Sequence, residues 1–251
     1  MNVTELKPEP EHDPERQARM NLAACFRWTA RLDMHEGIAN HFSYALSAGG
    51  SRFLLNPYGR HFSRMCAHDL LLVDANDPLG RERADVDPTA WCIHGAIHRA
   101  VPRARCVMHV HSKYATTLAA LADSSLPPID QNTMRFFERV ALDDGFDGMG
   151  LDEEAERLAT RVQDKPIVLM GNHGFMAVGA TIAETFDNLY YFERACETLI
   201  TALSTGRELR VASADVARKT ARQWQEYPEF AERHLAAVKE ILDRESPDYR
   251  D

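Results

Sequence analysis

The sequence predicts a mixed α/β fold, because stretches with helical periodicity alternate with short apolar runs that favour strands. The clearest helical pattern covers residues 14–34, where apolar side chains recur at three- and four-residue spacing before the helix stop Gly37. The clearest strand pattern is the short apolar run 104–108. With 251 residues, the chain is long enough for one large domain with a full core.

The remaining elements follow from the same two periodicities. Residues 40–46 and 52–55 flank Gly49-Gly50, which predicts a β-hairpin, and residues 126–132 form a proline-rich loop. Further strands are predicted at 70–74, 166–170 and 175–178, further helices at 89–101, 112–121, 152–163 and 182–203, and one or two polar helices over 213–242.

Composition excludes several classes of protein. The net charge of −9 is spread along the chain, which argues against nucleic-acid and anionic-membrane surfaces. No apolar run approaches the ~20 residues of a membrane span, and the polar N-terminus does not resemble a signal peptide. The five widely spaced cysteines indicate reduced core thiols in a cytoplasmic protein. We expect a flexible tail over residues 1–12 and a single domain over 13–251.

Two histidines, His109 and His111, stand one residue apart at the end of the predicted strand 104–108. Residues i and i+2 of a strand share a face, so both imidazoles can reach one metal ion while Val110 points into the core. His173, which follows another apolar strand, is the best third ligand. Such a site keeps one position open for chemistry. A pair of core or surface histidines without metal is the alternative.

Four motifs in this order resemble the class II aldolase/adducin family: Asn40-His41-Phe42-Ser43, Asn56-Pro57-Tyr58-Gly59, His109-Val110-His111 and Asn172-His173-Gly174. The resemblance covers about residues 25–205. It implies a three-layer α/β/α fold with a mainly antiparallel central sheet flanked by helices. It also implies a divalent ion on the three histidines, Zn²⁺ first and Mn²⁺ as the alternative, and a homo-oligomer, commonly a tetramer.

The same resemblance places a substrate pocket around the first two motifs. The positions of His41, Ser43, Asn56, Tyr58 and Gly59 belong to the substrate- and phosphate-binding region of the sugar-phosphate aldolases. There the position of His41 is typically Asn and that of Tyr58 typically Ser or Thr, so this chain departs in the manner of the adducin branch. The alternative is that these are turn residues that satisfy backbone groups.

Position 90 is the main departure from the aldolases. Their acid/base Glu stands just before the aromatic corresponding to Trp91, and here the residue is Ala90. A metal-bound water is the first choice of proton carrier, because it needs no extra residue. Tyr114, close after His111, and Asp130, in the proline-rich loop, are the candidate side chains. A solvated loop carboxylate is the alternative for Asp130.

His94 and His98 form an i,i+4 pair on the predicted helix 89–101, a spacing that can bind zinc. We favour a different interpretation, because the strand pair His109 and His111 supplies the better site. In this interpretation His94 is a buried, hydrogen-bonded histidine behind the metal pocket, and His98 is half-exposed.

The function that follows is a metal-dependent carbon–carbon lyase. An ion on three neutral imidazoles keeps its full positive charge and stabilises an enediolate or enolate. The substrate would be a small hydroxy- or oxo-acid or a sugar derivative, cleaved by an aldolase or a decarboxylase reaction. Decarboxylation fits Ala90 better, because departure of CO₂ needs no base to deprotonate a hydroxyl. The alternative is an adducin-like scaffold or binding protein that retains the metal site without catalysis.

Overall fold

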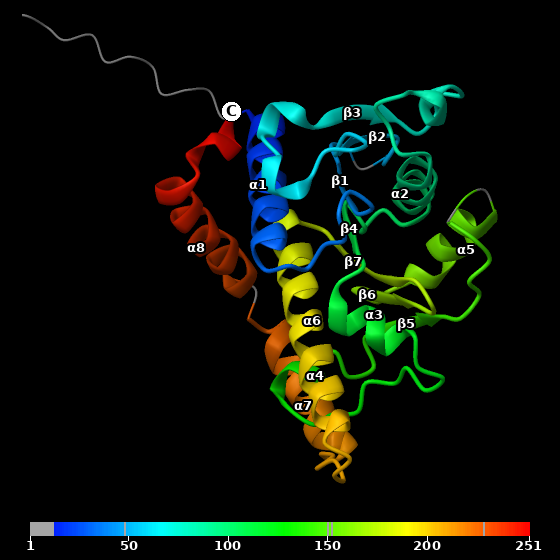
Figure 1. The fold of residues 1–251 in the computed structure, drawn as a ribbon, viewed down its shortest axis with the longest axis vertical. Helices are drawn as coiled ribbons and strands as arrows, with labels where there is room; N and C mark the ends of the chain where they lie inside the picture. Colours follow the sequence, from blue (N-terminus) through cyan, green and yellow to red (C-terminus); the bar gives the residue numbers. More distant parts are fainter. Residues whose placement is uncertain (1–12, 48, 150, 152, 228) are drawn as a thin grey trace, which may run out of the picture.

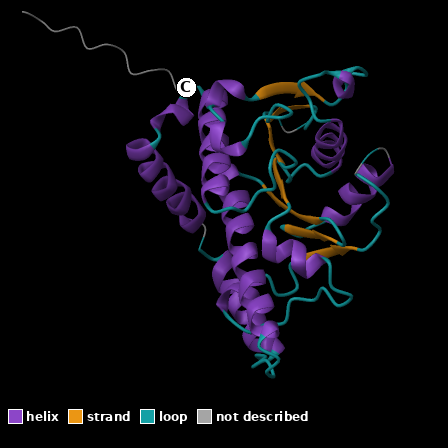
Figure 2. Ribbon diagram, in the orientation of Figure 1, coloured by secondary structure: helices purple, strands orange, loops and turns teal. Residues whose placement is uncertain are grey.

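A seven-stranded sheet in the order β3-β2-β1-β4-β7-β6-β5 forms the centre of the molecule, with helices on both faces (Figures 1 and 2). The computed structural model describes residues 13–47, 49–149, 151, 153–227 and 229–251, so the predicted tail 1–12 lies outside the described residues. The strands are β1 His41–Ala45, β2 Arg52–Leu55, β3 Leu71–Asp74, β4 Cys106–Val110, β5 Val140–Asp143, β6 Ile167–Met170 and β7 Gly174–Gly179.

The helices divide between the two faces of the sheet, which confirms the predicted three-layer α/β/α fold (Figure 1). Helices α1, α3 and α6 pack on one face, with α8 outside α1 and α6, and α2 and α5 pack on the other. The helices are α1 Pro14–Arg31, α2 Pro88–Ala100, α3 Lys113–Ala119, α4 Gln131–Arg135, α5 Glu153–Val162, α6 Ile182–Ser204, α7 Ala214–Gln225 and α8 Glu229–Glu245, with short 3₁₀ turns at Phe62–Arg64, Ala67–Asp69, Gly80–Glu82 and Pro247–Arg250.

Strand β4 lies at the middle of the sheet and carries the functional residues to its end. It pairs antiparallel with β1 on one side and with β7 on the other. Every other neighbouring pair is also antiparallel except β5 with β6, so the predicted mainly antiparallel sheet is confirmed. In the β1–β4 register, His41 stands opposite His109.

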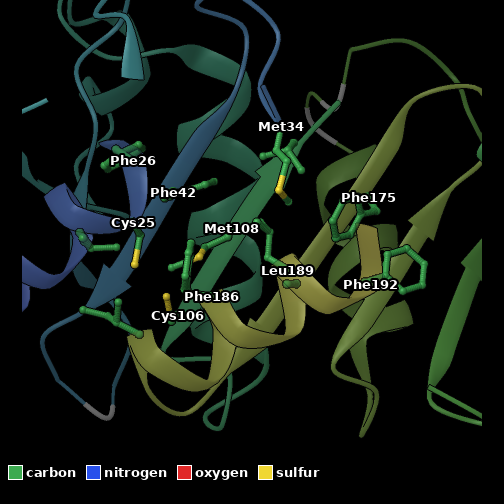
Figure 3. Packing of buried hydrophobic residues seen from close by; sticks show 14 of the residues in the cluster. Cys25, Phe26, Met34, Phe42, Cys106, Met108, Phe175, Phe186, Leu189 and Phe192 are labelled. Atoms are coloured by element: carbon green, nitrogen blue, oxygen red, sulfur yellow. The ribbon is translucent and has the colours of Figure 1, made fainter. Parts of the chain in front are cut away.

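Alternation along β4 directs its side chains to the two opposite faces of the sheet, each covered by an apolar cluster. Cys106, Met108 and Val110 are buried in the larger core together with residues of α1 and α6. Figure 3 shows this packing, in which Phe26, Phe42 and other labelled side chains of α1, β1, β7 and α6 surround Met108. His109 therefore emerges on the opposite face of β4, where α2 and α5 pack.

Capping residues set where several helices begin. The Asp13 side chain accepts a hydrogen bond from the backbone N–H of Glu15 at the start of α1. Asp87 caps α2 in the same way, directly before Pro88, whose missing N–H costs nothing at that position. The Thr181 side chain caps α6. These local signals explain why the predicted helices agree with α1, α2 and α6.

Two elements differ from the sequence prediction. Helix α4 begins inside the predicted loop 126–132, because Asp130 and Thr133 form a reciprocal capping box. Strand β5 was not predicted, since it is short, only partly buried, and placed at the sheet edge.

The polar C-terminal region forms two helices, α7 and α8. Within the described part of the chain, no helix is both long and apolar enough to cross a membrane.

Candidate metal centre and active site

The structure brings His109, His111 and His173 together. One ring nitrogen from each lies within 4.8 Å of those of the other two. The Nε2 atoms of His109 and His111 are 2.9 Å apart, and the ring of His173 lies 4.9 Å from each of the other two rings. Across the described ranges, this is the one group of three or more potential ligands at such spacing.

Backbone geometry brings His173 to the end of β4. It lies in the turn between β6 and β7, directly after Asn172, whose φ of 57° is a left-handed conformation that Asn tolerates. A Cβ atom at Gly174 would lie 2.7 Å from the carbonyl oxygen of Val110 and 2.9 Å from Cδ2 of His111. Glycine is therefore required for β7 to approach β4 this closely.

Hydrogen bonds at the far side of two rings direct their Nε2 lone pairs into the site. His109 donates from Nδ1 to the carbonyl oxygen of Phe175 at 2.9 Å, and His111 donates from Nδ1 to the carboxylate of Glu36 at 2.6 Å. In their neutral forms both Nε2 atoms then present lone pairs to each other. A cation placed between such lone pairs satisfies both, and the carboxylate–histidine arrangement is typical behind metal ligands.

The third ring and the protonation states also suit a metal ion. The Nδ1 atom of His173 is buried and has no hydrogen-bond partner among the described residues. Burial, with neighbouring imidazoles adding to it, holds the pKa of His109 well below its usual 6.5 and lowers the pKa of His173 to about 4. Both rings are therefore neutral at pH 7, the form that binds divalent ions. Three imidazoles suit Zn²⁺ or Mn²⁺.

A carboxylate from α6 holds the chain directly after His111. Ser112 stands at the N-cap position of α3, but its side chain does not cap the helix. Its hydroxyl donates to Glu193, which also accepts the backbone N–H groups of Tyr114 and Ala115 at 2.9 and 3.0 Å. Glu193, 2% exposed, therefore takes over the capping of α3.

His41 lies beside the three-histidine group. Its ring centroid is 4.9 Å from that of His109, and its Nδ1 is 2.6 Å from Nε2 of His94. The hydroxyl of Ser43 contacts Nδ1 of His94 and lies 2.7 Å from Nε2 of His98. The prediction that His98 is half-exposed is wrong, since it is 2% exposed. Its helix face, shared with His94, packs against β1 instead of facing solvent.

The other predicted pocket residues occupy different environments. Asn56 is buried, accepts the N–H of Phe42 at 3.0 Å and donates to the carbonyl of Asn40 at 3.3 Å, so it fixes the backbone on both sides of His41. Tyr58 is 57% exposed in a turn, followed by Gly59 with φ of 78°. Within the described part of the chain, neither Tyr58 nor Gly59 forms a hydrogen bond with the three histidines.

The two nominated proton carriers also differ in environment. Tyr114 is half-buried in the first turn of α3 and packs at the edge of the core, with Nζ of Lys113 5.5 Å from its ring centre. The Asp130 side chain accepts the backbone N–H of Thr133 at 2.8 Å and so serves as the cap of α4. Ala90 is fully buried one helical turn before His94, in an apolar cluster with Phe53 and Val86, among others.

Sequence reasoning missed two carboxylates that bond to the histidine site and the chain beside it, Glu36 and Glu193. Glu36 orients His111 across 75 positions of sequence, and Glu193 reaches Ser112 across 81. Neither stands in a motif with a ligand or capping spacing. The one local signal was the position of Glu36 in the turn that leads to Asn40, whose Oδ1 accepts the backbone N–H of Glu36 at 2.7 Å.

The fold and the histidine cluster define an α/β/α protein with a candidate divalent-metal centre at the ends of its central strands. Residues 20–200 match the family model described as the class II aldolase and adducin N-terminal domain. The chain belongs to this family, which confirms the resemblance seen in the four motifs.

Individual relatives come from both branches of the family. A Caulobacter vibrioides protein named after the class 2 aldolases is 32% identical over 95% of this chain and 94% of its own length. The decarboxylase NovR of Streptomyces niveus is 29% identical over 89% and 86% of the two chains. Human beta-adducin is 27% identical over 76% of this chain, which spans 27% of that longer protein.

Solved structures agree with the fold. The aldolase II superfamily protein from Pseudomonas syringae superposes with a TM-score of 0.85 at 30% identity and covers 98% of both chains. The L-fuculose 1-phosphate aldolase from Glaciozyma antarctica gives a TM-score of 0.81 at 23% identity, covering 98% of this chain and 97% of its own, a likeness in fold alone.

Proposed function

We propose that the protein is a metal-dependent carbon–carbon lyase of the aldolase or decarboxylase type, acting on a small hydroxy- or oxo-acid or a sugar derivative. The observation that carries the proposal is the group of His109, His111 and His173, whose ring nitrogens converge within 4.8 Å. A divalent ion bound there, Zn²⁺ first and Mn²⁺ as the alternative, polarises a carbonyl and stabilises the enolate or enediolate that bond cleavage produces.

The residues around the three ligands give each a fixed orientation. The backbone carbonyl of Phe175 holds His109, and Glu36 holds His111. Such outer partners raise the basicity of the ligating nitrogen and fix its tautomer. Glu193 anchors the backbone that follows His111, so the position of this ligand does not depend on a free loop.

Two observations favour decarboxylation over aldol cleavage. Ala90 offers no group for proton transfer, and its side chain is enclosed by apolar neighbours. Loss of CO₂ leaves its bonding electrons on the substrate without prior removal of a hydroxyl proton. A named decarboxylase is also among the relatives that align along most of the chain.

The proton that quenches the resulting anion needs a donor. Of the two nominated side chains, Asp130 is occupied as a helix cap, whereas the Tyr114 hydroxyl has no hydrogen bond within the described segments. We therefore assign Tyr114 as the candidate proton carrier and Asp130 as the lesser one. His41, Ser43, Asn56, Tyr58 and Gly59 stay proposed as the substrate-binding region, with Ser43 and Asn56 acting through their neighbours.

A second candidate function is a non-catalytic scaffold or binding protein that keeps the metal site. Ala90 favours it, and so does the similarity to beta-adducin. Both candidates predict a bound ion, so activity separates them.

The test begins with metal content. Elemental analysis of the purified protein should find one divalent ion per chain, and His111→Ala should lose most of it. His68→Ala, which removes an exposed histidine outside the group, is the matched control and should keep the ion. Unchanged metal content in His111→Ala would overturn the assigned ligands.

Activity is then screened with small oxo-acids, hydroxy-acids and sugar phosphates, with and without a chelator. Turnover that disappears on chelation and in His111→Ala, and persists in His68→Ala, supports the lyase. A fully metal-loaded protein without turnover on any of these classes would favour the scaffold.

A further inference from the structure

A continuous line of hydrogen bonds runs through the protein interior and ends at His41. It begins at the carbonyl oxygen of Ala104, which lies 2.7 Å from Nδ1 of His98. Nε2 of His98 lies 2.7 Å from the hydroxyl of Ser43, which contacts Nδ1 of His94. Nε2 of His94 lies 2.6 Å from Nδ1 of His41. All of these side chains are buried.

The chemistry of the groups at one end sets the direction of every bond in the line. A carbonyl oxygen only accepts, so His98 must carry its proton on Nδ1. In a neutral ring Nε2 is then an acceptor, and it takes the single hydroxyl proton of Ser43. The Ser43 oxygen is left to accept from Nδ1–H of His94. Nε2 of His94 in turn accepts from Nδ1–H of His41.

The argument requires neutral rings, and burial makes them neutral. Desolvation lowers the pKa of His98 to about 4, against a smaller raising effect of its bond to Ala104. It lowers the pKa of His94 well below the usual 6.5. At pH 7 the rings of His98 and His94 therefore carry one proton each, and the Ala104 carbonyl decides which nitrogen bears it.

The free end of the line faces the histidine group. His41 stands opposite His109 in the β1–β4 pairing, with ring centroids 4.9 Å apart. Its Nε2 has no hydrogen-bond partner in the described part of the chain, and the three-ligand group does not include it. In the neutral ring, Nε2 of His41 is therefore a hydrogen-bond acceptor beside the candidate metal centre. No described group of the protein donates a hydrogen bond to it.

We propose that the Ala104 carbonyl, through His98, Ser43 and His94, fixes His41 as the Nδ1-protonated tautomer, so that its Nε2 accepts a hydrogen bond from a substrate hydroxyl. The statement that a substrate hydroxyl binds to His41 rests on the proposed function. The statement that the hydrogen bonds fix the His41 tautomer does not. The substrate class is narrowed to oxo-acids or sugar derivatives with a hydroxyl next to the carbonyl. His94, Ser43 and His98 are positioning residues.

The tautomers can be read directly by neutron diffraction from crystals of the wild-type protein at pH 7. Deuterium is expected on Nδ1 of His41, His94 and His98, and on the Ser43 oxygen pointing to His98. Deuterium on Nε2 of His41 would overturn the proposal whatever activity the protein has, so this outcome is separate from failure of the lyase assignment.

Ser43→Ala interrupts the line without touching His41. The expected result is mixed or Nε2-protonated His41, seen by neutron diffraction or by nitrogen NMR of labelled histidines. Thr185→Val, which removes another buried hydroxyl that donates to the carbonyl oxygen of Thr181 at 2.8 Å and takes no part in the line, is the matched control and should leave His41 as in wild type. An unaltered His41 tautomer in Ser43→Ala would show that the line does not set it.

The hydroxyl preference is tested with two probes, hydroxypyruvate and pyruvate, by calorimetric titration of the metal-loaded protein. Wild type should bind hydroxypyruvate about tenfold more tightly, the equivalent of one hydrogen bond. His41→Asn keeps a donor near the Nδ1 position and removes the acceptor at Nε2, so the preference should vanish. A preference that survives in His41→Asn, or loss of the metal from this variant, would overturn the role of His41.

Discussion

Ala90 is the residue where this chain parts most clearly from a sugar-phosphate aldolase. It lies on the same face of α2 as His94 and His98, at successive four-residue steps, and its methyl group is fully buried. The face that points toward the sheet thus carries two imidazoles and no carboxylate. Chemistry that needs a strong proton acceptor at position 90 is therefore absent.

We expect turnover of fuculose- and rhamnulose-type 1-phosphates to be weak in wild type, because a positioned acid/base group contributes on the order of 10² to 10⁴ in rate. Ala90→Glu should raise it, and the uncharged Ala90→Gln should not. Steady-state assays of the three proteins, each checked for folding by circular dichroism, make the comparison. Robust wild-type turnover would contradict the expectation.

His98 gives the protein a pH-dependent stability. Burial lowers its folded pKa to about 4, whereas an unfolded histidine titrates near 6.5. The unfolded state therefore binds more protons between these values, and the free energy of unfolding falls as pH drops from about 6.5 to 4. The effect is on the order of 3 kcal/mol, from about 1.4 kcal/mol per pKa unit.

Urea unfolding at several pH values between 4 and 7 measures this slope. His98→Gln should make it shallower but not remove it, because burial also lowers the pKa of other histidines, among them His94, and the variant is less stable throughout. His68→Gln changes an exposed histidine and should leave the slope unaltered. An unchanged slope in His98→Gln would mean that other groups govern the acid transition.

The sequence predicted the residues that depend on local alternation and missed those that depend on distant partners. His109 and His111 share a face because strand geometry requires it, and the short strand pattern that precedes them is enough to predict this. Whether His98 faces solvent depends on how α2 docks on β1, and helical spacing alone does not decide that. Glu36 and Glu193 are joined to the site by folding, since no periodicity relates them to it.

At the scale of elements, one buried ion pair joins four helices. Arg135 of α4 bonds Asp187 and Asn188 of α6, the latter at 3.2 Å. Its guanidinium also lies 5.2 Å from the ring centre of Trp224 in α7. Asp187 accepts a second bond at 2.7 Å from Nδ1 of His234 in α8. Asp187 is therefore the shared anchor of the C-terminal helices.

Asp187→Ala should lower the free energy of unfolding by about 3–5 kcal/mol, because it leaves the Arg135 charge buried without its partner. Asp215→Ala removes an exposed aspartate of α7 and should cost at most about 1 kcal/mol. Urea titrations of both variants provide the measurement. A cost for Asp187→Ala as small as that of the control would contradict the anchoring role.

Element prediction succeeded where capping and periodicity agree and failed where the segment was short. Helix α6 has a capping threonine and many apolar positions, so its bounds were close to those expected. Helix α4 has five residues, too few for periodicity to appear. Strand β5 becomes a strand through its parallel pairing with β6, a partner about 27 residues later in the chain.

At the scale of the whole molecule, the apolar character of α6 has an explanation within one chain. The helix packs on β4 and β7 and contacts α3 and α8, which accounts for its apolar positions without a second subunit. Leu203, near the C-terminal end of α6, is 44% exposed, and the other exposed large apolar side chains of the described residues lie outside this helix. Four of them, here called the apolar rim, lie in two segments: Ile38, two residues after Glu36, and Phe146, Met149 and Leu151, which follow β5. The ring of Phe146 lies 6.0 Å from that of His173.

We propose a homo-oligomer in which this apolar rim is covered, since patches around a polar site commonly mark interaction surfaces. Light scattering at micromolar concentration should give a multiple of the 28.4 kDa chain mass. Replacing Phe146 and Met149 together by Ser should lower that mass. A wild-type mass near that of one chain would reject the assembly.

The opposed Nε2 atoms of His109 and His111, 2.9 Å apart, have a thermodynamic consequence. Folding brings two lone pairs face to face and buries the unpartnered Nδ1 of His173, and each costs free energy in the ion-free protein. The arrangement that suits a metal ion thus lowers the free energy of unfolding of the ion-free protein, as is common at binding sites. A ligand that binds only the folded state returns that stability in proportion to the logarithm of its concentration. In a cell short of metal, the first effect would then be on the amount of folded protein, before any substrate is involved.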